Sequence, residues 1–193
     1  IAQCLVGSEM CIRDRDIGTL VRGTEMDLSK RIPSSSLQKA KMLFVFMFMM
    51  RGLPFVDLAF LHKKDLQGNV LSYRRRKTGR TLRVLLSPEA LQLVHMVSNK
   101  DENSPYLFPI LRSKDGTEAA YKEYQSALRR FNYQLSALKT HLNMSSHLSS
   151  YSARHTWATM AYYCEIHPGI ISEAMGHSSI NVTAVSYTHL RAH

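Results

Sequence analysis

Arginine, histidine and tyrosine side chains in the C-terminal part of this 193-residue chain are suited to chemistry on a phosphate group. Arg154 is the strongest candidate, because a guanidinium binds a phosphate through two parallel hydrogen bonds and stays charged at any cellular pH. His177 follows Gly176, and glycine permits a tight turn that directs the imidazole into a cleft. Tyr151 lies three residues before Arg154, and its phenol can donate one hydrogen bond to a phosphate oxygen. The alternatives without a catalytic role are that Arg154 is a surface arginine on an amphipathic helix and that His177 is a structural histidine after a helix end.

Phosphoryl transfer needs positive charge for the non-bridging oxygens, a proton donor for the leaving oxygen and an in-line nucleophile. The sequence offers no convincing set of metal ligands, because its histidines lack carboxylates at ligand spacing and Cys164 alone does not make a zinc site. We therefore expect no metal and no other cofactor. Basic side chains must then supply the electrostatics.

Two motifs in this region resemble the C-terminal active-site box of the tyrosine recombinases, or phage integrases. They are residues 151–159 (YSARHTWAT) and residues 175–180 (MGHSSI). The resemblance implies that Arg154 and His177 hold a DNA phosphate while a tyrosine further along attacks it. The family has a histidine where this chain has Tyr151. A phenol is neither a cation nor a base near neutral pH, so we predict a phosphate ligand there.

Two basic residues earlier in the chain are predicted to complete the site. Lys77 lies in the turn of a predicted hairpin, where the family places a lysine that protonates the leaving 5' oxygen; a plain basic turn is the alternative. The family's first catalytic arginine precedes an acidic residue by three positions, and the corresponding position before Asp57 is Pro54. Arg51 is one helical turn earlier, so we predict that it reaches the same pocket. The alternative is that the domain has lost its first phosphate-binding arginine and that Arg51 caps the preceding helix.

The nucleophile and both ends of the chain depart from the family pattern. The resemblance places the attacking tyrosine nine residues after His177, at Ser186, whereas Tyr187 is one position out of register. Residues 1–15 (IAQCLVGSEMCIRDR) and 185–193 (VSYTHLRAH) resemble translated sequencing-adapter read-through, and we interpret both as artefact tails; the alternative is that both are genuine. Residues 16–184 are then one tyrosine-recombinase catalytic domain, without the N-terminal core-binding domain and without its native nucleophile.

Charge and composition indicate a polyanionic partner. Lys plus Arg outnumber Asp plus Glu by 25 to 15, and the formal net charge is +10. We expect phosphate contacts from two groups of basic residues, although a solvated face is the alternative for the second group. They are Arg74, Arg75, Arg76 and Arg80 in the hairpin, and Arg129, Arg130 and Lys139 on a long helix. The apolar run 42–50 is too short to span a bilayer, so no membrane role is expected.

Hydrophobic periodicity and turn signals predict a domain that is mainly α with a small antiparallel β-sheet (α+β). An apolar helix over 37–50 should be the buried centre, followed by a short helix over 55–61. Two strands, 69–74 and 81–86, flank a Gly-containing turn. A helix begins at Pro88 and ends near residue 98, and a long helix spans 119–138.

The resemblance implies site-specific recombination of double-stranded DNA through a 3'-phosphotyrosyl intermediate, without ATP or metal. The same resemblance implies further recombinase protomers on the DNA, which form a tetrameric synapse in the full-length protein. It also implies a location in the bacterial cytoplasm, at the nucleoid. Two alternatives stay open: a non-catalytic DNA-binding regulator, and an enzyme like type IB topoisomerases. We also predict that the five residues Arg51, Lys77, Tyr151, Arg154 and His177 converge on one basic concavity.

Overall fold

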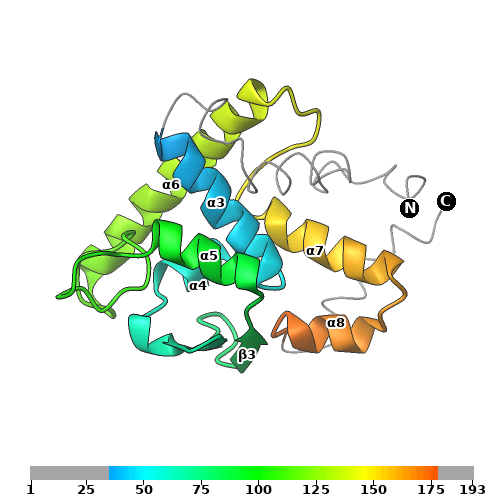
Figure 1. Ribbon diagram of the computed structural model, residues 1–193, viewed down its shortest axis with the longest axis horizontal. Helices are drawn as coiled ribbons and strands as arrows, with labels where there is room; N and C mark the ends of the chain where they lie inside the picture. Colours follow the sequence, from blue (N-terminus) through cyan, green and yellow to red (C-terminus); the bar gives the residue numbers. More distant parts are fainter. Residues whose placement is uncertain (1–34, 178–193) are drawn as a thin grey trace.

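Helices dominate the computed structural model, which describes residues 35–177 (Figure 1). The central helix is α3 (Ser35–Met49), and three other helices pack around it. These are α5 (Pro88–Val97), α6 (Glu118–His141) and α7 (Ser152–Tyr163). The two predicted artefact tails and Tyr187 lie outside the described residues, so their interpretation stays a prediction.

The central position of α3 follows from its sequence, which is apolar on nearly all sides in its second half. Phe44, Val45, Phe46 and Met47 are each at most 2% exposed, which confirms the predicted buried helix. Phe46 contacts the ring of Phe108 edge-on, with the centroids 5.4 Å apart. This helix therefore forms the interior against which the elements carrying the site are packed.

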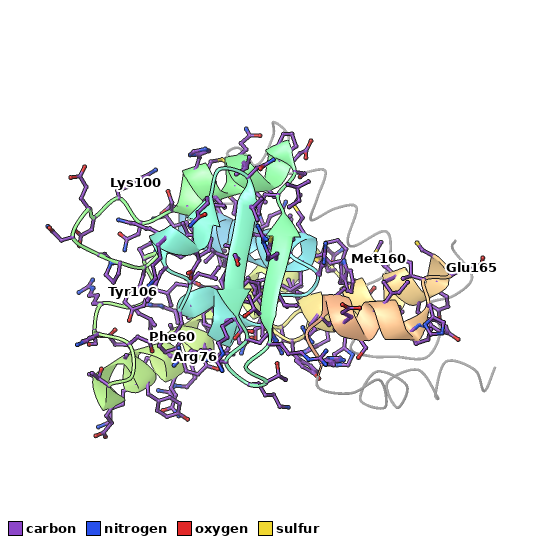
Figure 2. The ribbon with its side chains drawn as sticks, turned by 90° about the horizontal axis from the view of Figure 1, so that it is seen from below. Phe60, Arg76, Lys100, Tyr106, Met160 and Glu165 are labelled. Carbon is purple, nitrogen blue, oxygen red and sulfur yellow. The ribbon has the colours of Figure 1, made fainter. Side chains whose placement is uncertain are left out.

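A three-stranded antiparallel sheet covers one end of the helical core, and Figure 2 shows it face-on. Its order is β1 (Leu66–Gln67), β2 (Val70–Arg74) and β3 (Thr81–Leu85), with a 3-10 turn, η1 (Lys63–Asp65), before β1. The predicted hairpin of β2 and β3 is confirmed. The prediction of two strands was incomplete, because β1 has only two residues and shows no alternation that a sequence pattern could reveal. The fold class, mainly α with a small antiparallel sheet, is confirmed.

Helix ends follow local capping chemistry. Ser87 Oγ accepts a hydrogen bond from the Ala90 N–H at 3.3 Å at the start of α5. Thr117 Oγ1 accepts one from the Ala120 N–H at 3.2 Å at the start of α6. Helix α6 is longer than the predicted 119–138 and ends at His141, so that Lys139 lies in its last turn.

Two short helices connect the larger elements near the site. Helix α4 (Phe55–Ala59) follows α3 through a tight joint in which Arg51 and Gly52 have positive φ of 58° and 70°. Helix α8 (Pro168–Ala174) packs with the second half of α7 around a small apolar cluster that contains Ile171 and Met175 and is separate from the main core. Within residues 35–177, no helix is long and apolar enough to cross a membrane.

Candidate active site

Arg154, in the first turn of α7, is held in place by two main-chain carbonyl groups. Its Nη1 donates to the Gly52 oxygen at 2.9 Å, and its Nη2 donates to the Met175 oxygen at 2.8 Å. The residue is only 7% exposed, and burial, together with the positive charge of Arg75, lowers the pKa of the guanidinium to about 10. Arg154 is therefore charged at neutral pH and fixed between the α3–α4 joint and the end of α8.

Gly52 permits the close approach of the two elements that hold Arg154. A Cβ atom on Gly52 would lie 2.7 Å from the Arg154 Cα, which is too close for any side chain. The positive φ of Gly52 is also a conformation that glycine adopts at little cost. The joint between α3 and α4 therefore contacts the backbone of α7 directly.

His177 follows α8 and meets the hairpin through a tight turn. Gly176 has φ of 66°, and a Cβ there would lie 3.0 Å from Arg75 Cγ and from Leu82 Cδ1. Thr78 Oγ1 donates to the Gly176 oxygen at 3.0 Å. Burial lowers the pKa of His177 to about 4, and the charges of Arg154, Arg75 and Lys77 act in the same direction. The imidazole is thus neutral at pH 7 and can act in hydrogen bonding, but not as a cation.

The tip of the β2–β3 hairpin carries Lys77, which is exposed. The Lys77 charge contributes to the lowered pKa of His177, and the hydrogen bond from Thr78 to Gly176 joins the hairpin tip to the turn before His177. Tyr73 is buried. Burial, then the Asp57 charge, raise the pKa of Tyr73, and the charges of Arg75, Arg154 and Arg51 oppose this rise. Three arginines therefore contribute positive charge at one phenol.

Tyr151 lies at the N-terminal end of α7, next to Arg154, and is 57% exposed. Its ring packs edge-on against His155, with the centroids 4.4 Å apart. Burial, with the charge of Arg154, lowers the pKa of His155. The phenol thus stands at the solvent side of the buried arginine, in a position from which it can reach a ligand.

The structure brings together the five residues that the sequence singled out and that fall within the described range. They are Arg51, Lys77, Tyr151, Arg154 and His177, which come from the end of α3, the hairpin, the start of α7 and the turn after α8. Their catalytic roles stay predictions. Tyr187, the doubtful nucleophile, lies outside residues 35–177.

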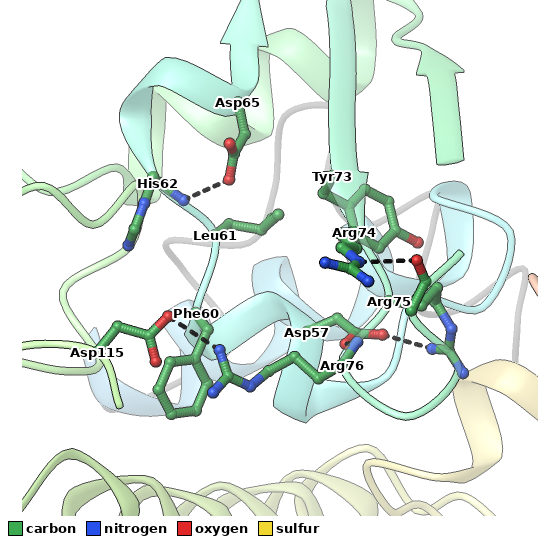
Figure 3. Close-up of a pocket in the computed structure, with 11 residues that line it drawn as sticks. Asp57, Phe60, Leu61, His62, Asp65, Tyr73, Arg74, Arg75, Arg76 and Asp115 are labelled. Carbon is green, nitrogen blue, oxygen red and sulfur yellow. Dashed lines mark hydrogen bonds and ion pairs between the residues drawn. The ribbon is translucent and has the colours of Figure 1, made fainter. Parts of the chain in front are cut away.

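The arginines of the hairpin differ in their surroundings, as Figure 3 shows. Arg76 pairs with Asp115 at 3.0 Å and lies 3.8 Å over the Phe60 ring (Figure 2). Arg74 is exposed and donates from Nε to the Gly79 oxygen at 2.9 Å, and Arg80 is exposed. Arg74 and Arg76 line a pocket of about 430 Å³ beside the sheet. Arg74 and Arg80 remain free to contact a phosphate, whereas Arg76 is already paired.

The basic residues of α6 lie apart from this cluster. Arg129 and Arg130 are exposed, Lys139 is half-buried, and Arg129 Nη2 donates to Ser126 Oγ at 3.3 Å. Helix α6 packs on α3 and α4. Their role in DNA binding stays a prediction.

Arg75 and Asp57 are the site residues whose importance sequence reasoning missed. Arg75 was predicted to be one of several surface contacts, but it is only 4% exposed and pairs with the buried Asp57. The missed signal is the strand alternation: Leu71 and Tyr73 of β2 face the core, so period two continues to Arg75. Asp57 entered the sequence reasoning only as the residue that marks the position of Pro54.

The site thus combines a buried arginine, a neutral histidine and a hairpin lysine in a mainly helical domain with a small sheet. The phage integrase family matches residues 26–193, and this chain belongs to that family. No curated protein matches it.

Solved structures share the fold at low sequence identity. A Tn1549 transposon integrase in complex with transposon right end DNA is 16% identical, with a TM-score of 0.62 over 96% of this chain and 63% of that chain. The XerA recombinase is 14% identical, with a TM-score of 0.60 over 95% and 64% of the two chains. XerH, bound to a palindromic difH substrate in a post-cleavage complex, is 15% identical, with a TM-score of 0.63 over 92% and 48%. The chain spans less than two thirds of each.

Proposed function

We propose that this chain supplies the catalytic domain of a site-specific DNA recombinase, or integrase, that cleaves and rejoins double-stranded DNA. The observation that supports this most strongly is the grouping of the buried Arg154, the half-buried His177 and the exposed Lys77, whose charges act on one another although they come from three separate elements. Membership of the phage integrase family and the DNA complexes of similar structures point the same way.

The proposed reaction transfers a phosphoryl group from one oxygen to another. A tyrosine hydroxyl loses its proton to water and its oxygen attacks the scissile phosphorus, so that a bond from phosphorus to that oxygen forms and the bond to the 5' oxygen breaks. Arg154 and Tyr151 bind the non-bridging oxygens, and the neutral His177 adds a hydrogen bond. Lys77 gives a proton to the leaving 5' oxygen. Attack of a 5' hydroxyl from another strand on the 3'-phosphotyrosyl bond then reverses these steps.

The proposed partners follow from the same reaction. Exchange between two duplexes needs double-stranded DNA and further recombinase protomers, assembled as a tetramer in the full-length protein. A similar structure is a lambda integrase dimer bound to a COC' core site. We place the protein in the bacterial cytoplasm, at the nucleoid, because its substrate is there. Residues 16–184 are proposed as the native domain.

The test is a suicide DNA substrate that traps the 3'-phosphotyrosyl adduct. It is run on this chain and on a variant with Ser186→Tyr and Tyr187→Phe, which moves the phenol into the register that the family pattern requires. Adjacent residues of a helix differ by about 100° in direction, and a displacement of about 1 Å costs around a hundredfold in rate. We expect a trace of adduct from the unchanged chain and efficient adduct formation from the variant.

The other outcomes separate the remaining possibilities. Equal adduct from both proteins would show that Tyr187 is the working nucleophile and that residues 185–193 are native. Sequence-specific binding without adduct from either protein would favour the DNA-binding regulator. Relaxation of supercoiled plasmid without any need for paired half-sites would favour the topoisomerase-like enzyme.

A further inference from the structure

Arg75 leaves the hairpin tip and points into the interior of the domain. Its Nη1 donates to Asp57 Oδ2 at 2.5 Å, and the two side chains are only 5% and 1% exposed (Figure 3). The second oxygen of Asp57 accepts the Arg76 backbone N–H at 2.9 Å. Asp57 is thus fully occupied in holding the end of β2 and the guanidinium of Arg75 in one orientation.

One donor of Arg75 remains without a partner. The Nε–H is buried, and no acceptor lies within hydrogen-bond distance of it in the described part of the chain. A buried donor without an acceptor costs roughly 1–3 kcal/mol, so such an atom is a sign of a missing ligand. The Nε–H and an Nη–H of a guanidinium form the fork that binds two oxygens of one anion.

The charges around Asp57 do not balance. Arg75 and Arg154 are both buried, and their guanidinium groups share only one buried carboxylate among the described residues, that of Asp57. Arg154 donates to the neutral carbonyl groups of Gly52 and Met175. The described interior therefore holds an excess positive charge, and an unpaired buried charge is unfavourable unless an anion approaches it.

The two guanidinium groups reach the same turn from different elements. The Arg75 side chain lies against Gly176, since a Cβ there would lie 3.0 Å from Arg75 Cγ. Arg154 donates to Met175, the residue before Gly176. His177 follows directly. An anion that contacted His177 would therefore have Arg154 and Arg75 beside it.

We propose that Arg75 is the second phosphate-binding arginine of the site, supplied by the hairpin, and that Asp57 is its positioning residue. This rests on the proposed function, in which the anion is the scissile phosphate of DNA. Pro54, three residues before Asp57, occupies the place where an arginine was expected, and Arg75 of the hairpin pairs with Asp57 instead. Arg51 is then a neighbour of Tyr73 and not the main replacement.

The test uses Arg75→Lys, which keeps a cation next to Asp57 but removes the planar fork. Arg83→Lys, on strand β3 of the same hairpin and exposed, is the matched control. A second variant, Asp57→Asn with Arg75→Gln, removes both charges together and so leaves no unpaired buried carboxylate, in case the single change disturbs folding. Circular dichroism and thermal unfolding establish that each variant is folded before any measurement is compared.

The first measurement is binding of inorganic phosphate, read as the increase in melting temperature with phosphate over chloride at equal ionic strength. We expect the apparent Kd for phosphate to rise at least about tenfold in Arg75→Lys and in the double variant, because a charge-assisted, two-pronged contact is lost. Arg83→Lys should bind phosphate as the unchanged chain does. Equal binding by Arg75→Lys and the unchanged chain would overturn the proposal.

The second measurement is DNA cleavage in the background with Ser186→Tyr and Tyr187→Phe. Arg75→Lys should lower the cleavage rate by about a hundredfold while the Kd for DNA changes severalfold at most, as expected for loss of a preorganised donor. A merely structural Arg75 would leave the rate of the folded variant unchanged, which would also overturn the proposal. If the background protein fails to cleave, the proposed function fails, and phosphate binding alone still decides whether Arg75 is an anion ligand.

Discussion

Arg154 combines two tasks, because its guanidinium joins the α3–α4 joint to the end of α8 through the Gly52 and Met175 carbonyl groups. These bonds use one hydrogen on each Nη atom, and its remaining donors are available to a ligand. The residue that is predicted to bind the phosphate therefore also holds the site together. Loss of its side chain should affect stability and chemistry at once.

Arg154→Ala should lower the free energy of unfolding by roughly 2–4 kcal/mol, because two buried carbonyl groups lose their donors. Urea unfolding measures this loss. In the background with Ser186→Tyr and Tyr187→Phe, the transition state for cleavage should lose on the order of 3 kcal/mol. The control Arg129→Ala, on the exposed face of α6, should stay within about 0.5 kcal/mol of the unchanged chain. A fully stable Arg154→Ala protein would contradict the structural half of the prediction.

His177 should make the protein less stable in mild acid. Its pKa is about 4 in the folded chain, whereas the unfolded chain has the ordinary value of 6.5. Between these values the unfolded chain binds a proton that the folded chain excludes, so the free energy of unfolding falls as the pH drops from 6.5 towards 4. Below about pH 4 both states are protonated and the loss is complete.

Urea unfolding of the unchanged chain and of His177→Gln from about pH 4 to about pH 8 isolates this contribution. The stability of the unchanged chain relative to the variant should decrease steadily as the pH falls from about 6.5, and it should be constant above about pH 7. A difference that does not vary with pH would show that His177 is not shielded from protonation in the folded state.

The residues of the site were predictable to different degrees. Arg154 and His177 stand in short motifs whose spacing is visible along the chain. Arg75 is one of three consecutive arginines, and only the strand alternation through Leu71 and Tyr73 distinguishes it from its neighbours. Its partner Asp57 is 18 positions earlier, and no local pattern indicates such a pairing.

At the scale of elements, the backbone of the α3–α4 joint closely approaches the backbone of α7. The positive φ of Gly52 turns the chain, and the absence of a side chain allows Arg154 Cα to approach. The position of α7 relative to the core therefore depends on a single glycine.

Gly52→Ala should cost about 3 kcal/mol in the free energy of unfolding, from the left-handed backbone and from a Cβ placed 2.7 Å from Arg154 Cα. Gly68→Ala is the matched control. Gly68 has φ of 59°, but a Cβ there would have no atom within 4 Å, so about 1 kcal/mol is expected. Denaturant unfolding of both variants measures the difference. Equal losses would show that the close contact with α7 is unimportant.

Helices α3, α5 and α6 were predicted within a few residues, because their apolar periodicity and their capping residues are local. No bounds were predicted for α7, and most of the short elements were not predicted. Strand β1 has two residues, η1 has three and α8 has seven, and elements of that length are set by contacts with the rest of the domain. The prediction of a helix over 55–61 was close, since α4 ends at Ala59.

At the scale of the whole molecule, DNA binding should depend strongly on salt, because basic residues that contact phosphates provide its affinity. Each phosphate contact contributes about 0.9 to the slope of log affinity against log salt concentration. Arg74→Ala with Arg80→Ala should lower that slope by about 2, as measured by fluorescence anisotropy with labelled duplex DNA. A slope unaffected by these changes would exclude the hairpin as a DNA contact. The pair Arg129→Ala and Arg130→Ala shows in the same assay whether α6 is a second contact or a solvated face.

The arrangement of the elements was the least predictable feature. Composition and periodicity indicated a mainly helical domain with a small sheet. The docking of the α8 turn on the hairpin depends on contacts such as Thr78 with Gly176, which are 98 positions apart. Contacts at such separations are decided by the packing of the whole domain.

The small apolar cluster of α7 and α8 has a consequence for behaviour on heating. Gly176 and His177 are attached to this cluster, whereas Arg75 and Asp57 belong to elements packed on the main core, and Arg154 joins the two through Gly52 and Met175. A cluster with few buried apolar side chains opens at lower cost than a large one, so local opening should precede global unfolding. We expect catalysis to fade several degrees below the melting temperature, with amide hydrogens of α8 exchanging sooner than those of α3. The enzyme would then be inactivated by warmth while most of its fold is still intact.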